Sequence, residues 1–254
     1  MAQIFHPSMN IVARVTIFGA IFFAAGISLA GWAFVNSPYV TQVNVVREQA
    51  VPFSHQHHVR ELGLDCRYCH YNVEKSSSAG LPTTEICMGC HSQVWKDAEV
   101  LRPVRESFAK GEPLLWTRVH DLPDFVYFSH KIHVAKGVGC ESCHGRVDEM
   151  PLMRRAASLH MDWCVDCHRH PELAVRPQAD LFQFGRNKSL LGGVSTEPLM
   201  RAAFTAEGQS APGTRSIPSA THRKSSDTLK SGSELVAEYG IVTRQLTDCV
   251  VCHR

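Results

Sequence analysis

The sequence predicts one long N-terminal helix followed by a domain of short helices and irregular coil, with little or no sheet. Three observations lead to this prediction. An uncharged apolar run of nineteen residues extends from Ile17 to Val35. Beyond it, all ten cysteines fall into five units of the form Cys-x-x-Cys-His. Finally, the segment Phe53–His70 resembles the segment Phe128–His144, which indicates an internal repeat.

The five Cys-x-x-Cys-His units are typical of sites that bind haem covalently. Two thiols at this spacing can each form a thioether bond to a vinyl group of haem, and the following imidazole then binds the iron as proximal ligand. The sequence therefore predicts five haem c cofactors. In chain order, the first to fifth units are Cys66, Cys69 and His70; Cys87, Cys90 and His91; Cys140, Cys143 and His144; Cys164, Cys167 and His168; and Cys249, Cys252 and His253.

Two other uses of paired cysteines are weighed against haem. Cys-x-x-Cys also serves zinc sites and thioredoxin-like redox sites, and ten cysteines can form a disulfide framework. Zinc binding does not explain why a histidine follows every pair, and a disulfide framework needs no histidine at all. Because no cysteine lies outside the five units, covalent haem is the favoured interpretation.

Five haems change what the composition implies. Their apolar surface replaces much of the usual side-chain core, which favours short helices and irregular connections over a sheet. The formal charge of the chain is +2, but a ferric haem with ionised propionates and two neutral ligands carries about −1, so five haems shift the total to about −3. This charge balance gives no support to nucleic-acid binding.

The apolar run Ile17–Val35 is long enough to cross a bilayer as a helix. A cleaved signal peptide is the alternative, because Arg14 precedes the run, and Ser28 and Ala30 fit a cleavage site. The run exceeds the usual length of a signal-peptide core, so an uncleaved anchor in contact with membrane lipid is favoured. Arg14 places the N-terminus in the cytoplasm, and the haem domain is expected on the outer, periplasmic side of a bacterial cytoplasmic membrane.

The predicted organisation follows from these features. Within the linker, the valines between Val40 and Val46 favour an extended segment, and a helix is expected over Glu234–Leu246. The predicted segments are a cytoplasmic N-terminus (1–10), a transmembrane anchor (11–36), a linker (37–52), a first dihaem module (53–115), a second dihaem module (116–180), an extended segment that contacts another subunit (181–233), and a C-terminal helix with the fifth haem site (234–254).

The internal repeat consists of FSHQHHVRELGLDCRYCH and FSHKIHVAKGVGCESCH, and the first copy carries one inserted residue. Three positions then coincide: His55 with His130, His58 with His133, and Gly63 with Gly137. Each copy is followed by a further unit, so two dihaem modules and one terminal haem are predicted. Histidines three residues apart in a helical turn project near one another, so one segment can hold two haems close together.

Nine histidines remain as candidate distal ligands, outside the five units and the cytoplasmic His6. The residues predicted to bind iron are His55, His58, His120, His130 and His133. His120 has no counterpart in the first repeat and is predicted to be the fifth distal ligand, because Asp121 and Pro123 indicate a fixed turn that orients the ring. Since the candidates outnumber the irons, no site has to stay open for a substrate.

The remaining candidates are weaker. His57 aligns with Ile132 in the second repeat and is interpreted as a spare histidine, and His170 follows His168 too closely to reach the opposite face of the same haem. His160 and Met161 are rivals between which the sequence does not decide, because thioether ligation is also common and raises the reduction potential. His222 lies in a stretch rich in Ser, Pro, Gly and Thr and is interpreted as a solvated side chain.

The string Phe-Ser-His-x-x-His before an attachment unit resembles the multihaem cytochrome family that includes trihaem and tetrahaem periplasmic cytochromes. In that family the first histidine binds the haem attached just downstream, and the second binds a neighbouring haem. The resemblance implies that His55 serves the first unit and His130 the third. It also implies that His58 and His133 each reach another haem.

The strings FSHQHHVRELGLDCRYCH, RVHDLPDFVYFSHKIHV and MDWCVDCHR, together with an anchor and five units, resemble the pentahaem cytochrome subunit of bacterial alternative complex III. The resemblance covers about residues 10–180 and the last unit. It implies quinol oxidation by a membrane complex. The partners that it implies are polytopic quinol-binding subunits, a large iron–sulfur subunit and a monohaem cytochrome c.

Three functional classes follow. The favoured one is an electron-relay subunit, itself without a catalytic residue, in a quinol-oxidising complex. The alternative is a free-standing, membrane-anchored quinol dehydrogenase that feeds a periplasmic reductase. A multihaem enzyme with a vacant iron position is the third, and it is disfavoured because every unit carries a proximal histidine.

Overall fold

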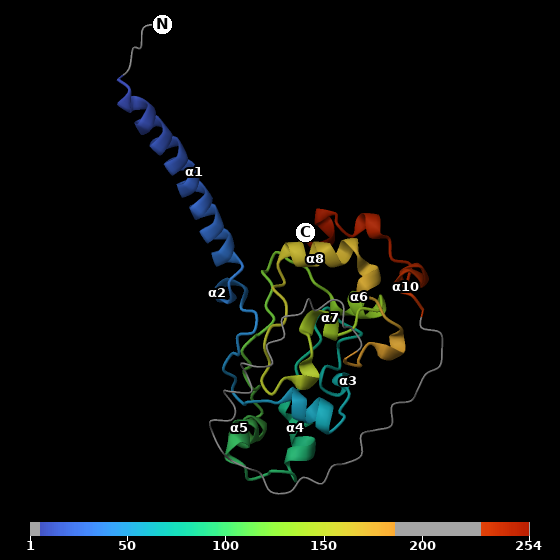
Figure 1. Cartoon of the computed structure of the whole chain (residues 1–254). Coiled ribbons are helices and arrows are strands. Elements are labelled where there is room, and N and C mark those ends of the chain that lie inside the picture. The colour runs from blue at the N-terminus through green and yellow to red at the C-terminus, as the bar shows by residue number, and fades with distance from the viewer. Residues whose placement is uncertain (1–5, 186–229, 254) are drawn as a thin grey trace.

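The structure is a computed structural model that describes residues 6–185 and 230–253. The predicted extended segment 181–233 lies largely outside the described residues, and so does His222. The remaining chain consists of one long helix that projects from a domain of short helices and coil (Figure 1).

The long helix α1 spans Ser8–Val35 and buries none of its side chains. With the following turn it forms a helical stretch, Ser8–Thr41, that is long and apolar enough to cross a membrane. Large apolar side chains such as Phe22 and Phe23 are 76% and 72% exposed along it. Apolar surface of this extent is costly in water, which agrees with the predicted contact with lipid.

The domain contains only short helices. Those that carry the units and the repeated histidines are the π-helix η1 (Gln56–Glu61), α3 (Cys66–Cys69), α4 (Thr84–His91), α6 (His130–Ala135), α7 (Glu141–His144), α8 (Met161–Arg169) and α11 (Cys249–Cys252). The others are α2 (Pro38–Thr41), η2 (Glu99–Leu101), α5 (Arg102–Lys110), η3 (Val147–Glu149), η4 (Pro171–Leu173), η5 (Gln178–Asp180), α10 (Gly232–Glu238) and η6 (Thr243–Gln245).

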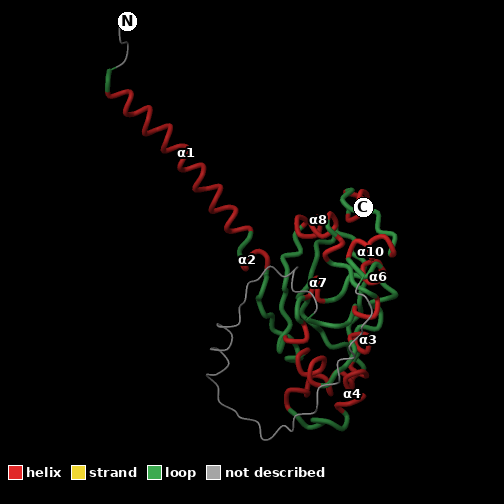
Figure 2. The backbone as a smooth tube through the Cα atoms, turned by 45° about the vertical axis from the view of Figure 1, so that its right-hand side comes forward, coloured by secondary structure: helices red, strands yellow, loops and turns green. Residues whose placement is uncertain are grey.

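Helices and coil account for the whole described chain, as predicted, and no β-strand occurs in it (Figure 2). Three isolated β-bridges are present: Val43 with Arg155, Val46 with Arg154, and Val138 with Val175. The linker was expected to be extended through its valines, but its first part, Pro38–Thr41, is the helical turn α2. Pro38 at the first position of the turn favours this start.

The apolar core of the domain is small. One cluster of buried side chains contains Val51, Leu101 and Val104, and a second contains Val73, Val134 and Leu181. Val73 belongs to the first predicted module (53–115) and Val134 to the second (116–180), so the second cluster joins the two modules. Two such clusters are little core for a domain of this length, which agrees with a fold that is completed by bound groups.

The two copies of the repeat differ in their helix type. In the second copy, α6 is an α-helix, whereas in the first copy η1 is a π-helix in which the Leu62 amide donates to the His57 carbonyl at 3.0 Å. The extra residue of the first copy falls between His58 and Gly63 and is therefore taken up as an additional residue in the helical turn. Both turns end at a glycine with positive φ, +71° at Gly63 and +81° at Gly137.

The C-terminal segment packs on the second copy of the repeat. Tyr239 donates a hydrogen bond from its hydroxyl to the Arg176 carbonyl at 3.1 Å, and the Lys136 ammonium donates to the Tyr239 carbonyl. The helix α10 is shorter than the predicted helix over Glu234–Leu246. It ends at Glu238 because Gly240 adopts a φ of +58°, which breaks the helical path.

Gly137 and Gly63 provide a matched pair of substitutions. Gly63→Ala introduces only the strain of a positive φ, about 1 kcal/mol, because no atom lies within 4 Å of the added Cβ. At Gly137 the added Cβ overlaps the Tyr239 ring, so we expect Gly137→Ala also to displace Tyr239 and to lose its hydrogen bonds, each worth about 1 kcal/mol. Thermal unfolding followed by circular dichroism should show a clearly larger fall in midpoint for Gly137→Ala. Equal falls would contradict the docking of Tyr239.

Candidate haem sites

Each Cys-x-x-Cys-His unit lies on or at the end of a short helix. In a helical turn, residues three apart lie on the same face, so the two cysteines of a unit point to the same side. The third unit begins with Cys140 directly before α7, and its histidine is the last residue of that helix. None of the ten cysteines forms a disulfide bond. This local geometry allows the two cysteines of one unit to bond to two substituents of the same porphyrin ring.

Four of the five proximal histidines donate from Nδ1 to a backbone carbonyl. The pairs are His70 with Gly80 at 2.8 Å, His91 with Val94 at 3.0 Å, His168 with Leu246 at 2.8 Å, and His253 with Phe125 at 3.1 Å. A carbonyl oxygen only accepts, so Nδ1 carries the proton and the lone pair lies on Nε2. Such partners orient metal-bound imidazoles in proteins and leave Nε2 as the ligand atom. The residues therefore fit haem iron.

The remaining proximal histidine is His144 of the third unit, which is distinguished by its burial and by the histidines around it. Burial first, and then the nearby rings of His120 and His130, lower its pKa well below the ordinary value. More weakly, His70 and His55 act in the same direction. His144 is thus a neutral imidazole at the centre of the histidines of the first and third units.

The Phe-Ser-His-x-x-His string has the same geometry in both repeats. The ring of Phe53 stacks on His58 at 4.4 Å, and that of Phe128 stacks on His133 at 4.6 Å. In both copies the second histidine donates from Nδ1 to the serine carbonyl at 2.8 Å. Aromatic stacking and this bond together fix each ring with Nε2 pointing outward.

Three pairs of imidazoles face one another at a common distance. The ring centroids lie 6.2 Å apart for His58 and His91, 6.3 Å for His130 and His144, and 6.2 Å for His133 and His168. Two imidazoles that bind one metal ion from opposite sides, through bonds of about 2.0 Å each, place their centroids about 6 Å apart. The observed spacing therefore leaves room for one iron between the rings of each pair.

His55 also lies near a proximal histidine. Burial, and then the rings of His70 and His58, lower the pKa of His55 to about 4. Its Nδ1 is buried without a hydrogen-bond partner. The structure therefore brings together a distal candidate and a proximal histidine in the first, second, third and fourth units.

His120 lies beside the third unit. Its ring centroid is 4.3 Å from that of His144, which is too short for the two to bind one iron from opposite sides. Its Nε2 is buried without a hydrogen-bond partner, and burial, followed by the Arg155 cation, lowers its pKa to about 4. In the fifth unit the ring of His253 contacts Phe125, with centroids 5.8 Å apart.

The weaker candidates lie mostly at the surface. His57 pairs with Glu61 at 2.7 Å, and His170 pairs with Glu172 at 3.4 Å. His160 precedes α8, and the side chain of Met161 is 70% exposed. Among the described residues, no group of three or more His, Cys, Asp or Glu side chains is arranged to hold a metal ion.

The cysteines place the five units in a row. Neighbouring thiols of different units affect one another's pKa, and these neighbours give the order. Burial, and then the nearby Cys87 thiol, raise the pKa of Cys69, so the first unit lies next to the second. Contact with the Cys140 thiol raises the pKa of Cys66, so the first unit also lies next to the third. Burial, and then the nearby thiols of the fourth unit, raise the pKa of Cys143 to about 12, so the third unit lies next to the fourth. Burial, and then the nearby Cys252 thiol, raise the pKa of Cys164, so the fourth unit lies next to the fifth.

The spatial order is therefore second, first, third, fourth and fifth unit, which differs from the chain order. The same order is visible in Figure 1, where α4 lies at one end of the domain, α3 and α7 follow, and α8 lies at the other end beside the C-terminal helices. Neither the spacing of the units nor the repeat predicted this order, because it depends on how the two copies pack.

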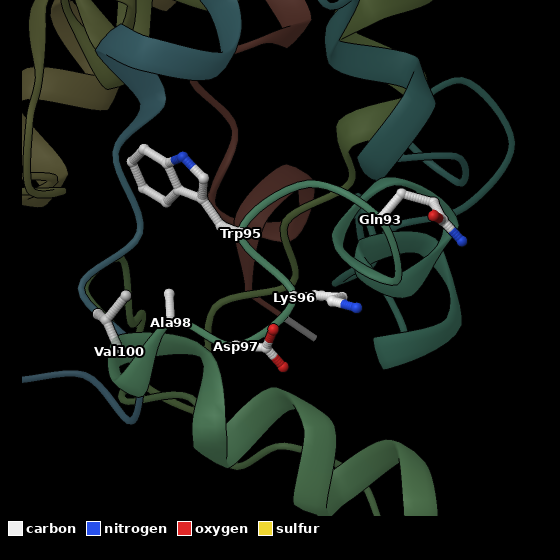
Figure 3. Close-up of a pocket in the computed structure, with 6 residues that line it drawn as sticks. All are labelled: Gln93, Trp95, Lys96, Asp97, Ala98 and Val100. Carbon is white, nitrogen blue, oxygen red and sulfur yellow. The ribbon is translucent and has the colours of Figure 1, made fainter.

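An open pocket lies beyond the second unit, at the α4 end of the row. Its lining contains no cysteine or histidine: Gln93, Trp95, Lys96, Asp97, Ala98 and Val100. The indole of Trp95 is 63% exposed and points away from Lys96 and Asp97 (Figure 3). It stacks on the far side against His57, with centroids 6.1 Å apart. The pocket therefore adjoins the second unit, because two of its lining residues, Gln93 and Trp95, flank Val94, whose carbonyl accepts from His91.

Comparisons with known proteins show a similarity to cytochromes c. Residues 126–183 match the family model described as cytochrome c7 and related cytochrome c. Over 114 residues the chain is 40% identical to the menaquinone reductase multihaem cytochrome c subunit of Nitratidesulfovibrio vulgaris strain Hildenborough. The aligned region covers 44% of this chain and 51% of the relative. The chain thus matches about half the length of that relative. The chain therefore carries a multihaem cytochrome c domain behind an N-terminal apolar helix.

Proposed function

We propose that this chain is an electron-relay subunit that holds five haems c in a row, within a membrane-bound quinol oxidoreductase of the alternative complex III type. The observation that carries the proposal is the unbroken sequence of neighbouring cysteines from the second unit to the fifth. Haem c, when bound, supplies a one-electron iron couple at each unit. A continuous row next to a helix that can cross a membrane suits transfer between a membrane partner and an outer one.

The chain's residues would hold each haem in a defined way. The cysteines of each unit would form the thioether bonds, and the histidine that follows would bind the iron on the proximal side. Ring distances support His58 opposite His91, His130 opposite His144, and His133 opposite His168. The neighbours of His55 support a place opposite His70. His120, His160 and Met161 remain for the fifth iron.

The proposed location and partners rest on the helix and on the relative. The helix α1 would anchor the chain in the cytoplasmic membrane with its N-terminus inside, and the haem domain would lie on the outer side. Polytopic quinol-binding subunits, an iron–sulfur subunit and a monohaem cytochrome c would be the partners, as in the complex that the sequence resembles. The relative's description as one subunit of a menaquinone reductase supports membership in a multisubunit assembly.

That relative also favours a second candidate function, in which electrons run toward menaquinone rather than away from quinol. Purification in mild detergent, identification of the subunits and a haem-to-protein ratio test the assembly. Assays in both directions, with quinol plus an oxidised carrier and with a reduced carrier plus menaquinone, then separate the two candidates. We expect five haems per chain, large partner subunits and quinol oxidation. Purification as a single chain would favour the free-standing quinol dehydrogenase instead.

The supply of ligands leads to a spectroscopic prediction. Four neighbouring imidazole pairs would supply four irons with two axial ligands each, and His120, His160 and Met161 are the candidates for the fifth iron. We expect all five haems to be low-spin and the reduced protein to bind carbon monoxide only slowly. Electron paramagnetic resonance and carbon monoxide difference spectra measure both properties. A substantial high-spin signal in the intact protein would show an open iron.

A further inference from the structure

The two repeats carry opposite charges inside their first attachment loops. The first unit reads Cys66-Arg67-Tyr68-Cys69 and the third reads Cys140-Glu141-Ser142-Cys143, so Glu141 occupies the position of Arg67. The two side chains also differ in burial, because Arg67 is 49% exposed and Glu141 is 2% exposed. A buried charge next to a cysteine that holds a haem calls for an explanation, since burying an ionised carboxylate is costly.

Glu141 is held by a donor from the backbone and by two arginines. The amide of Gly185 donates to both carboxylate oxygens, at 3.2 and 3.1 Å. Arg176 approaches one oxygen to 3.6 Å with Nη2, and Arg146 approaches the other to 3.9 Å with Nε. Both arginine distances exceed those of a charge-assisted hydrogen bond, so the charges attract one another without being fully neutralised.

Arg176 is itself buried, with its side chain 7% exposed. It packs flat against Gly139, the residue before Cys140, where an added Cβ would lie 2.7 Å from its Nε. Nη1 donates to the Gln183 carbonyl at 3.0 Å, while Nε and Nη2 are buried without a hydrogen-bond partner. The positive charge of Arg176 therefore lies against Gly139, the residue that precedes the third unit.

Buried charges act strongly on a nearby redox centre, because the interior screens them poorly. The oxidised iron carries one more positive charge than the reduced iron, so a nearby cation raises the reduction potential and a nearby anion lowers it. A charge at the surface is screened by water and salt, and its effect is small. Arg67, at the matching position of the first unit, is such a surface charge and is already paired with Asp65 at 2.9 Å.

We propose that Glu141 and Arg176 set the reduction potential of the haem in the third unit, in opposite directions, whereas Arg67 leaves the haem of the first unit nearly unaffected. The inference rests on the proposed haem binding. Neither side chain would bind the iron. Both would act through their charges on the reduction potential of the haem in the third unit, which is central in the row.

Two substitutions of opposite sign test the proposal. Glu141→Gln keeps an oxygen that accepts from Gly185 but removes the negative charge, so the potential of the third haem should rise. Arg176→Met removes the positive charge and should lower it. We expect each shift to be at least tenfold in the equilibrium constant of reduction, which corresponds to 59 mV for one electron. Arg176→Lys retains the charge and should stay close to the wild-type value.

The measurement is a potentiometric titration of the full-length protein in detergent, followed by visible and electron paramagnetic resonance spectra. The moving component is assigned to the third haem if it is missing from the Cys140→Ser/Cys143→Ser variant. Arg67→Met is the matched control and should shift its component by much less. Shifts of the same sign in Glu141→Gln and Arg176→Met, no shift in either, or an equal shift in Arg67→Met would overturn the proposal. A wild-type chain that lacks five haems would instead overturn the proposed function.

Discussion

Removing the third haem site with Cys140→Ser and Cys143→Ser is expected to abolish quinol-driven turnover of the assembled complex while four haems per chain remain. The third unit is central in the row, since Cys66 of the first unit contacts Cys140, and Cys143 neighbours the cysteines of the fourth unit. Without it, the first and second units are separated from the fourth and fifth.

The experiment compares this variant with others that remove the first or the fourth site in the same way. Each variant is checked for a haem-to-protein ratio of four, for assembly with the partner subunits, and for full reduction of the remaining haems by dithionite. A row without branches predicts that every one of these internal removals stops turnover. Substantial turnover in the variant that lacks the third haem would contradict the linear order and would indicate a branched path.

The sequence predicted the elements of the fold that depend on local spacing. The apolar run predicted a helix that can cross a membrane, and the five units predicted a domain without strands; both agree with the structure and with the match to a cytochrome c family model. The aligned strings predicted that the two copies share one geometry. In both copies a phenylalanine stacks on the second histidine, and a serine carbonyl accepts from it.

Features that depend on contacts between distant segments were not predicted. The insertion in the first repeat was recognised, but its form as a π-helix depends on hydrogen bonding that the spacing does not reveal. The aligned repeats show Glu141 at the position of Arg67, but the burial of Glu141 depends on Arg176 and Gly185, which are distant in the sequence. The place of His120 beside His144 depends on the packing of the segment before the second repeat, where Arg155 donates to the Val119 carbonyl at 3.1 Å.

His130 and His133 are expected to serve different haems, although they are three residues apart on the same helix. The ring of His130 is parallel to that of His144 within 8°, at 6.3 Å, whereas the ring of His133 lies 6.2 Å from His168 in the next unit. His130 is further oriented by the first module, because its Nδ1 donates to the Ser77 carbonyl at 2.8 Å. Loss of either ring should therefore leave one iron without its distal ligand, and the iron affected should differ between the two cases.

We accordingly expect His130→Ala to convert the third haem to a high-spin form and His133→Ala to convert the fourth. Each variant should lose one haem's share of the low-spin signal, and the resonances lost should differ. The double variant should lose both shares, because two separate irons are affected. His58→Ala is the matched variant in the first repeat, and it should open the second haem through loss of the ring that faces His91. Loss of the same resonance in His130→Ala and His133→Ala would show that both rings act on a single iron, and the order of the row would then lose its support at the link between the third and fourth units.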